Sequence, residues 1–145
     1  MPKILFIHGP NLGRLGKRKP EIYGYETLAE ITEKVEKAVK AKGCSLLAFQ
    51  SNSEGDLIDF LEANLDAESA IVNPGALMMA GWSLYDALEA FPAPWVEVHL
   101  SNVWSREPFR HSSILSPLAK GVVAGFGTLG YLMAVQALIE EEPKT

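Results

Sequence analysis

The sequence predicts an α/β fold in which a parallel sheet of five strands is covered by helices on both faces. Short apolar runs such as residues 3–8, KILFIH, have the continuous hydrophobic character of strands buried on both faces. Segments with apolar residues at helical spacing separate these runs. Because strands and helices alternate along the chain, neighbouring strands are expected to be parallel and joined by right-handed crossovers.

The predicted elements follow one another in a regular order. After the strand at 3–8 comes a long loop, and then Thr27 to Glu30 has the T-x-x-E pattern of a helix-capping box. Gly43 is predicted to end the helix that follows. Further strands are predicted at 44–50, 70–73, 95–99 and 121–126, and further helices after the capping residue Ser53, at 82–91 and at 128–141.

This order predicts a single domain over residues 1–145. Five strands in a chain of this length fit a flavodoxin-like, doubly wound sheet in a three-layer α/β/α arrangement. The alternation of elements comes from the residues themselves, whereas the strand order 2-1-3-4-5 is expected by analogy with that fold.

Composition excludes several classes of protein. Hydrophobic residues make up 48% of the chain, which is too many for disorder. The single cysteine, Cys44, permits no internal disulfide and suits a reducing cytoplasm, and no zinc-ligand spacing occurs. No apolar stretch is long enough to cross a membrane, so no membrane partner is expected. The formal charge of −5 argues against nucleic acid as a partner.

The arginines are confined to two short segments of this acidic chain. Arg14 and Arg18 lie in the first long loop, and Arg106 and Arg110 lie after the predicted fourth strand. Guanidinium groups bind carboxylates and phosphates through paired hydrogen bonds. The pattern favours an anion site, and structural ion pairs are the alternative.

Hydrogen-bonding residues gather where the predicted strands end. Ligands of open parallel sheets bind beyond these carboxyl ends. The ends carry imidazoles, amides and a hydroxyl rather than aspartates, namely His8, Asn11, Gln50, Asn52, Asn73, His99, Ser101 and Asn102.

The first loop is long for an α/β unit and contains a candidate base. It carries Tyr23 together with Arg14 and Arg18, and several glycines allow it to bend. A free tyrosine, with a pKa of ~10, is a poor base at neutral pH, but a nearby guanidinium stabilises the phenolate. Tyr23 is therefore either a general base or an ordinary surface residue.

His99 is a candidate acid at the end of the fourth strand. Histidine exchanges protons near neutral pH, although a lone histidine is more often structural. Glu97 lies two residues before it, and Ser101 with the local backbone N–H groups is suited to hold a carboxylate. Arg106 and Arg110, four residues apart, would share a face of a helical turn, either as a clamp for a substrate oxygen or as a basic surface turn.

One motif imitates a cofactor site. GFGTLG at 125–130 matches G-x-G-x-x-G, but no further strand with an acidic residue follows it, so no dinucleotide is expected. The glycines are instead predicted to allow a tight turn and close helix packing. Neither a cofactor nor a metal is predicted.

Several blocks of the chain resemble the type II 3-dehydroquinate dehydratases. They are GPNLGRLGKRKPEIYG, QSNSEGDLID, NPGA, EVHLSN, REPFRHSS and GFGTLGY, in the family's order and spacing. The resemblance implies conversion of 3-dehydroquinate to 3-dehydroshikimate in the shikimate pathway, without metal or cofactor, by a flavodoxin-like subunit. It also implies a homododecamer built from trimers.

The resemblance assigns roles to individual residues. Tyr23 is expected to take the C2 proton, Arg18 to favour the ionised tyrosine, Asn11 to stabilise the enolate through a water, and His99 to protonate the leaving hydroxyl. The implied substrate-binding residues are Asn73, Asp86 reaching a neighbouring subunit's site, Leu100 and Ser101 at the carboxylate, Arg106 in a lid, and Arg110 at ring hydroxyls.

The chain departs from the family pattern at a few positions. Gly13 and Ser53 replace an asparagine and a histidine, and Met79 replaces a histidine expected to bind a substrate hydroxyl. Loss of that contact is expected to weaken substrate binding, by ~1–3 kcal/mol, rather than change the reaction. The alternatives are a catalytically impaired paralogue and a flavodoxin-like receiver or flavin-binding module.

Overall fold

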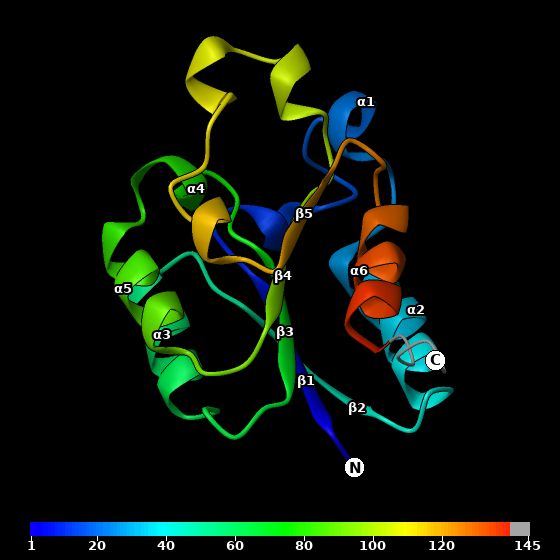
Figure 1. Ribbon diagram of the computed structural model, residues 1–145. Helices are drawn as coiled ribbons and strands as arrows, with labels where there is room; N and C mark the ends of the chain where they lie inside the picture. Colours follow the sequence, from blue (N-terminus) through cyan, green and yellow to red (C-terminus); the bar gives the residue numbers. More distant parts are fainter. Residues whose placement is uncertain (140–145) are drawn as a thin grey trace, which may run out of the picture.

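The computed structural model describes residues 1–139, and its centre is a five-stranded sheet in which every neighbouring pair is parallel (Figure 1). The strand order is β2-β1-β3-β4-β5, which confirms the predicted flavodoxin-like arrangement. The strands are β1 (Lys3–His8), β2 (Ser45–Gln50), β3 (Ser69–Asn73), β4 (Trp95–His99) and β5 (Gly121–Ala124).

Two pairs of helices cover the two faces of the sheet (Figure 1). On one face, α2 (Leu28–Lys40) and α6 (Leu129–Ile139) pack against β1, β3 and β4, and on the other face lie α3 (Glu54–Glu62) and α5 (Trp82–Ala90). The short elements are α1 (Pro20–Tyr23), α4 (Leu77–Ala80) and the 3₁₀ turns η1 (Leu12–Arg14), η2 (Val103–Ser105), η3 (Pro108–Arg110) and η4 (Ser116–Leu118).

Local signals position the long helices as the sequence predicts. Thr27 accepts a hydrogen bond from the backbone N–H of Glu30, and the Glu30 side chain bonds back to the Thr27 backbone, which completes the capping box. Ser53 caps α3 through the backbone N–H of Asp56. These caps fix where the chain leaves the long first loop and the end of β2.

Several predicted boundaries differ from the structure. Helix α2 ends at Lys40, before Gly43, which lies in the following turn with a φ of 79°. Strand β5 ends at Ala124 because residues 125–126 already belong to a bend. Arg106 and Arg110 do not share one helical turn, since Arg106 follows η2 and Arg110 ends η3. The predicted end of the last helix, at 140–141, lies outside the described residues.

The first loop is folded rather than extended. Residues 9–27 contain η1 and α1, and Asn11 adopts a left-handed conformation with a φ of 71° at the beginning of η1. Together with η2 and η3 from the loop after β4, α1 stands above the carboxyl ends of the strands (Figure 1). Within residues 1–139 no helix is long and apolar enough to cross a membrane.

His8 ends β1, but its side chain is part of the core. The residue is 1% exposed, and its ring packs edge-on against Phe6 and Tyr131 with centroid distances of 4.2 and 5.5 Å. Neither ring nitrogen has a hydrogen-bond partner among residues 1–139. Burial lowers the pKa of His8 from 6.5 to about 3. The imidazole is therefore neutral at physiological pH.

His8 should make the fold sensitive to acid. Below pH 6.5 the unfolded chain binds a proton that the folded chain does not, so the free energy of unfolding falls as the pH falls toward 3. The loss between pH 7 and 5 from this group is about 2 kcal/mol. His8→Phe should remove that part of the pH dependence in urea denaturation at one protein concentration. An identical pH dependence in both proteins would mean that His8 is not held neutral.

Candidate active site

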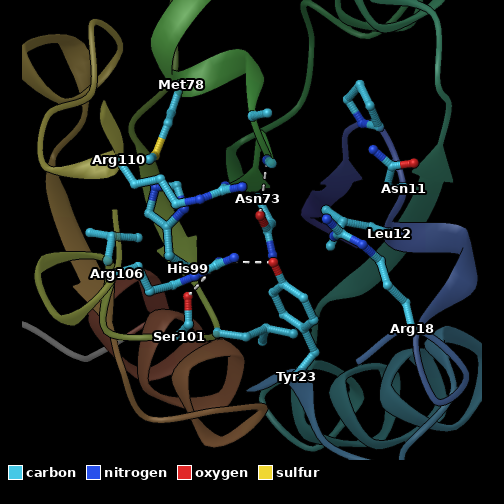
Figure 2. A pocket seen from close by; sticks show the side chains of 15 residues that line it. Asn11, Leu12, Arg18, Tyr23, Asn73, Met78, His99, Ser101, Arg106 and Arg110 are labelled. Carbon is cyan, nitrogen blue, oxygen red and sulfur yellow. Dashed lines mark hydrogen bonds between the residues drawn. The ribbon is translucent and has the colours of Figure 1, made fainter. Parts of the chain in front are cut away.

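A pocket lies at the carboxyl ends of the central strands (Figure 2). Residues from the first loop and from the segments after β3 and β4 form its walls. Of the ten residues singled out in the sequence as catalytic or substrate-binding, nine line it: Asn11, Arg18, Tyr23, Asn73, His99, Leu100, Ser101, Arg106 and Arg110.

Tyr23 stands between two guanidinium groups. It is the last residue of α1, which ends when Gly24 turns at a φ of 87°. Arg106 Nη1 donates a hydrogen bond of 2.8 Å to the Tyr23 hydroxyl, as Figure 2 shows, and another of 3.2 Å to Ser101 Oγ. The guanidinium carbon of Arg18 lies 4.7 Å from the centre of the Tyr23 ring. The hydroxyl of Tyr23 thus accepts from one guanidinium, and the ring lies beside two.

His99 is paired with a buried carboxylate. His99 is 7% exposed and Glu97 is fully buried, both on β4. His99 Nε2 lies 2.5 Å from Glu97 Oε2, and Ser116 Oγ donates to Glu97 Oε1 at 2.7 Å. Burial raises the pKa of Glu97, but His99, Ser116 and Ser113 together outweigh burial and hold it below its usual range. The carboxylate thus engages Nε2 and leaves Nδ1 without this partner.

The end of β4 is held by the turn after β5. The backbone N–H of Gly125 donates to the His99 carbonyl at 3.2 Å, and that of Gly127 donates to the Leu100 carbonyl at 2.9 Å. Both glycines have positive φ, which confirms the predicted tight turn in the GFGTLG motif. A Cβ at Gly130 would meet Val98 and Val123 at 3.3 Å, which confirms the predicted close packing of the helix.

The polar residues at the end of β2 support the pocket from outside. Asn52 Oδ1 accepts hydrogen bonds from the backbone N–H of Asn11 at 2.9 Å and from Gln50 Nε2 at 3.2 Å. Gln50 Nε2 also donates to the Gly9 carbonyl at 3.2 Å. These amides were expected at the ligand edge, and they instead fix the backbone that presents Asn11.

Asn73 is held rigidly at the end of β3. Its Nδ2 donates to the Tyr131 hydroxyl at 2.8 Å, and its Oδ1 accepts from the backbone N–H of Gly75 at 3.1 Å. Burial raises the pKa of Tyr131, and the hydrogen bond with Asn73 opposes that effect without reversing it. Tyr131 therefore stays a neutral phenol whose hydroxyl accepts from Asn73.

The remaining candidates divide between the pocket and the surface. Arg110 lines the pocket and is paired with Glu107 at 2.6 Å. Arg14 is exposed and outside the pocket lining, so only three of the four arginines reach this site. Asp86 is exposed on α5 and is also outside the lining.

Helix α4, which follows the NPGA block, contributes a methionine that was not singled out for the pocket from the sequence. Met78 is 2% exposed and lines the pocket, whereas Met79, which was expected to replace a substrate-binding histidine, is not among the lining residues. Two large apolar residues near the beginning of α5 differ in burial, because Met78 packs within the chain while Trp82 is 62% exposed.

The partners of His99 are the main residues that sequence reasoning missed. Glu97 was noted only as a neighbour of His99, and its alternation on the strand puts both side chains on one face. Ser116 carries no sequence signal, because its loop had no predicted structure. Among residues 1–139 no cluster of three or more His, Cys, Asp or Glu side chains could hold a metal.

The arrangement suits proton transfer on an anion. A phenol beside two cations is a candidate base, an imidazole on a carboxylate is a candidate acid, and three arginines provide positive charge in the same pocket. Such a site can remove one proton from a substrate and supply another to a leaving group.

Comparisons with known proteins agree with this chemistry. The chain matches the family Dehydroquinase class II over residues 2–139. It is 54% identical to a 3-dehydroquinate dehydratase of Roseiflexus castenholzii over 138 residues, which cover 94% of this chain and 88% of that protein. It is 46% identical over 145 residues to that of Halalkalibacterium halodurans, covering 99% and 100% of the two chains.

Solved structures give the same result. The type II dehydroquinase of Propionibacterium acnes superposes with a TM-score of 0.93 at 34% identity, covering 97% of this chain and 98% of that one. That of Butyrivibrio crossotus superposes with a TM-score of 0.92 at 37% identity, covering 94% and 97%. Fold, site and sequence agree, and the chain belongs to the type II 3-dehydroquinate dehydratase family.

Proposed function

We propose that this chain converts 3-dehydroquinate to 3-dehydroshikimate and water, with Tyr23 as base and His99 as acid. The observation that carries the proposal is that both side chains line one pocket together with three arginines. The relatives named 3-dehydroquinate dehydratase support the reaction. The substrate is a small anion, for which an arginine-lined pocket is the suitable partner.

In the first step, the phenolate of Tyr23 takes a proton from C2, next to the substrate ketone, and an enolate forms. Arg106 supports the phenolate through the 2.8 Å hydrogen bond to its oxygen, and Arg18 supports it from the ring face. Asn11 stabilises the negative oxygen of the enolate through a water, because its backbone is fixed beside the pocket by Asn52.

In the second step, the enolate collapses and expels the hydroxyl, which takes a proton from His99 Nδ1 and leaves as water. Glu97, held on Nε2, fixes the orientation of the imidazole for this transfer. The C2 proton then leaves Tyr23 for solvent, and solvent returns one to His99. The reaction therefore releases one water and no net proton.

Substrate binding uses the remaining residues of the pocket. Ser101 and the backbone at Leu100 receive the carboxylate, where the guanidinium of Arg106 already reaches the Ser101 hydroxyl. Asn73 orients the substrate from a position fixed by Tyr131 and Gly75, and Arg110 contacts ring hydroxyls. Arg106 acts as the lid residue, since it lies in the long loop after β4.

We also propose a cytoplasmic homo-oligomer, with twelve subunits arranged as trimers. Asp86 reaches the pocket of a neighbouring subunit from its exposed position on α5. Trp82, on the same helix and 62% exposed, provides apolar surface for that contact. The lone thiol of Cys44 is buried and free, which suits a reducing compartment.

Isotope exchange should separate the base from the acid. His99→Ala should still exchange the C2 proton with deuterated solvent while product formation falls by ~10²–10⁴-fold, the usual contribution of a general acid. Tyr23→Phe lacks the oxygen that accepts the proton and should do neither. NMR follows exchange, and enone absorbance follows product.

The opposite pattern of C2 exchange in the two variants would mean that the base and the acid have been assigned the wrong way round. Exchange by Tyr23→Phe without exchange by His99→Ala would make His99 the base. Near-normal turnover in both variants would locate the chemistry in another part of the molecule.

The arginines beside Tyr23 should control the acidic limb of the pH profile. Arg106→Ala removes a donor to the hydroxyl and Arg18→Ala removes a cation from the ring, so each should move the rise of kcat/KM to higher pH. Arg14→Ala is the matched control, because Arg14 is exposed in the same loop. If the acidic limb of a variant stays at the wild-type pH, the arginine replaced in that variant does not stabilise the ionised Tyr23.

Assembly should be visible in solution mass. Light scattering should give a particle near twelve times the subunit mass of 15.8 kDa. Trp82→Glu should shift it toward smaller species by placing a charge in the proposed contact. A wild-type protein that remains monomeric at micromolar concentration would contradict the proposal.

A further inference from the structure

Residues 111–116 connect the loop that carries Arg106 and Arg110 to η4. This segment is anchored to the core at its centre. Leu115 is fully buried among the residues between the sheet and α5, and the backbone N–H of Ile114 donates to the Met78 carbonyl at 2.8 Å. The anchored centre of the segment therefore fixes the positions of its two ends, His111 and Ser116.

The first end of the segment touches the base side of the pocket. His111 Nε2 lies 3.0 Å from the backbone carbonyl of Arg106. The guanidinium of the same arginine donates to the Tyr23 hydroxyl and to Ser101. The imidazole thus holds the backbone from which this guanidinium extends.

The second end touches the acid side. Ser116 Oγ donates to Glu97 Oε1 at 2.7 Å, while the other oxygen of Glu97 holds His99. Glu97 is fully buried, so each donor that it keeps favours its anionic form. Residues of both ends line one cavity together with His99 and Glu97, namely His111, Ser113 and Ser116.

We propose that residues 111–116 position both proton-transferring groups, with His111 setting Arg106 against Tyr23 and Ser116 setting Glu97 against His99. Neither residue lines the substrate pocket, so both act through another side chain. The inference rests on the roles proposed above for Tyr23 and His99. It makes one short segment responsible for the geometry of two separate steps.

Substitutions at the two ends should affect different rates, because Ser116 serves the second step and His111 serves the first. Ser116→Ala removes a donor from the buried carboxylate and should slow only the loss of the hydroxyl. Product formation should fall roughly tenfold, the effect of a hydrogen bond to a charged group, while C2 exchange continues. The ratio of C2 exchange to product formation should therefore rise. His111→Phe should slow both together, because proton removal comes first.

Conservative variants separate positioning from folding. Ser116→Thr keeps a hydroxyl and should restore the wild-type ratio, and His111→Gln keeps an N–H donor and should recover part of the exchange rate. Ser112→Ala is the matched control, because Ser112 lines the same cavity but is exposed. Its ratio and its turnover should both match the wild type.

The experiment has a result that overturns the proposal. If Ser116→Ala and Ser116→Thr lose turnover equally with the exchange ratio unchanged, the segment only packs against the core. The same holds for His111 if its Phe variant exchanges C2 at the wild-type rate. A wild-type chain that forms no enone would instead overturn the proposed function, so the two failures are distinguishable.

Discussion

A buried carboxylate imposes the main constraint on this molecule. Glu97 lies on β4, between β3 and β5, with no exposed surface, where an unpartnered charge would cost several kcal/mol. Its two oxygens are matched by His99 from the same strand and by Ser116 from a turn that follows a long loop. The path of that loop, and with it the position of Arg106, is tied to satisfying one carboxylate. The geometry of the pocket and the burial of Glu97 thus depend on the same hydrogen bonds.

Two positive charges lie close together around Tyr23 of the first loop. Two guanidinium groups approach one phenol ring at 4.7 and 5.3 Å from its centre, and they come from segments far apart in the sequence. Their mutual repulsion is tolerable because the aromatic face and hydroxyl are electron-rich and because the pocket opens to solvent. An anionic substrate would relieve the repulsion further. The free site is therefore electrostatically incomplete in a way that favours an anion.

The sequence was sufficient for the fold because hydrophobic periodicity and helix caps are local signals, as at Thr27 and Ser53. It was also sufficient for most of the pocket, because the ends of parallel strands meet at one edge, as Asn73 and His99 do. It failed where structure depends on distant partners. The roles of Ser116 and Asn52 come from contacts across many residues. Nor could periodicity predict that Met78, rather than Met79, would face the pocket.

The bond between Asn73 and Tyr131 has a consequence for synthesis of the chain. Asn73 is on β3, but the hydroxyl that accepts from its amide is on α6, 58 residues later. Strand β5 and the turn that holds the carbonyls of His99 and Leu100 also come late in the chain. Every lining residue is therefore synthesised before Tyr131 and before the turn at 125–127. The side chain of Asn73 therefore reaches its final position only after α6 has docked on the sheet.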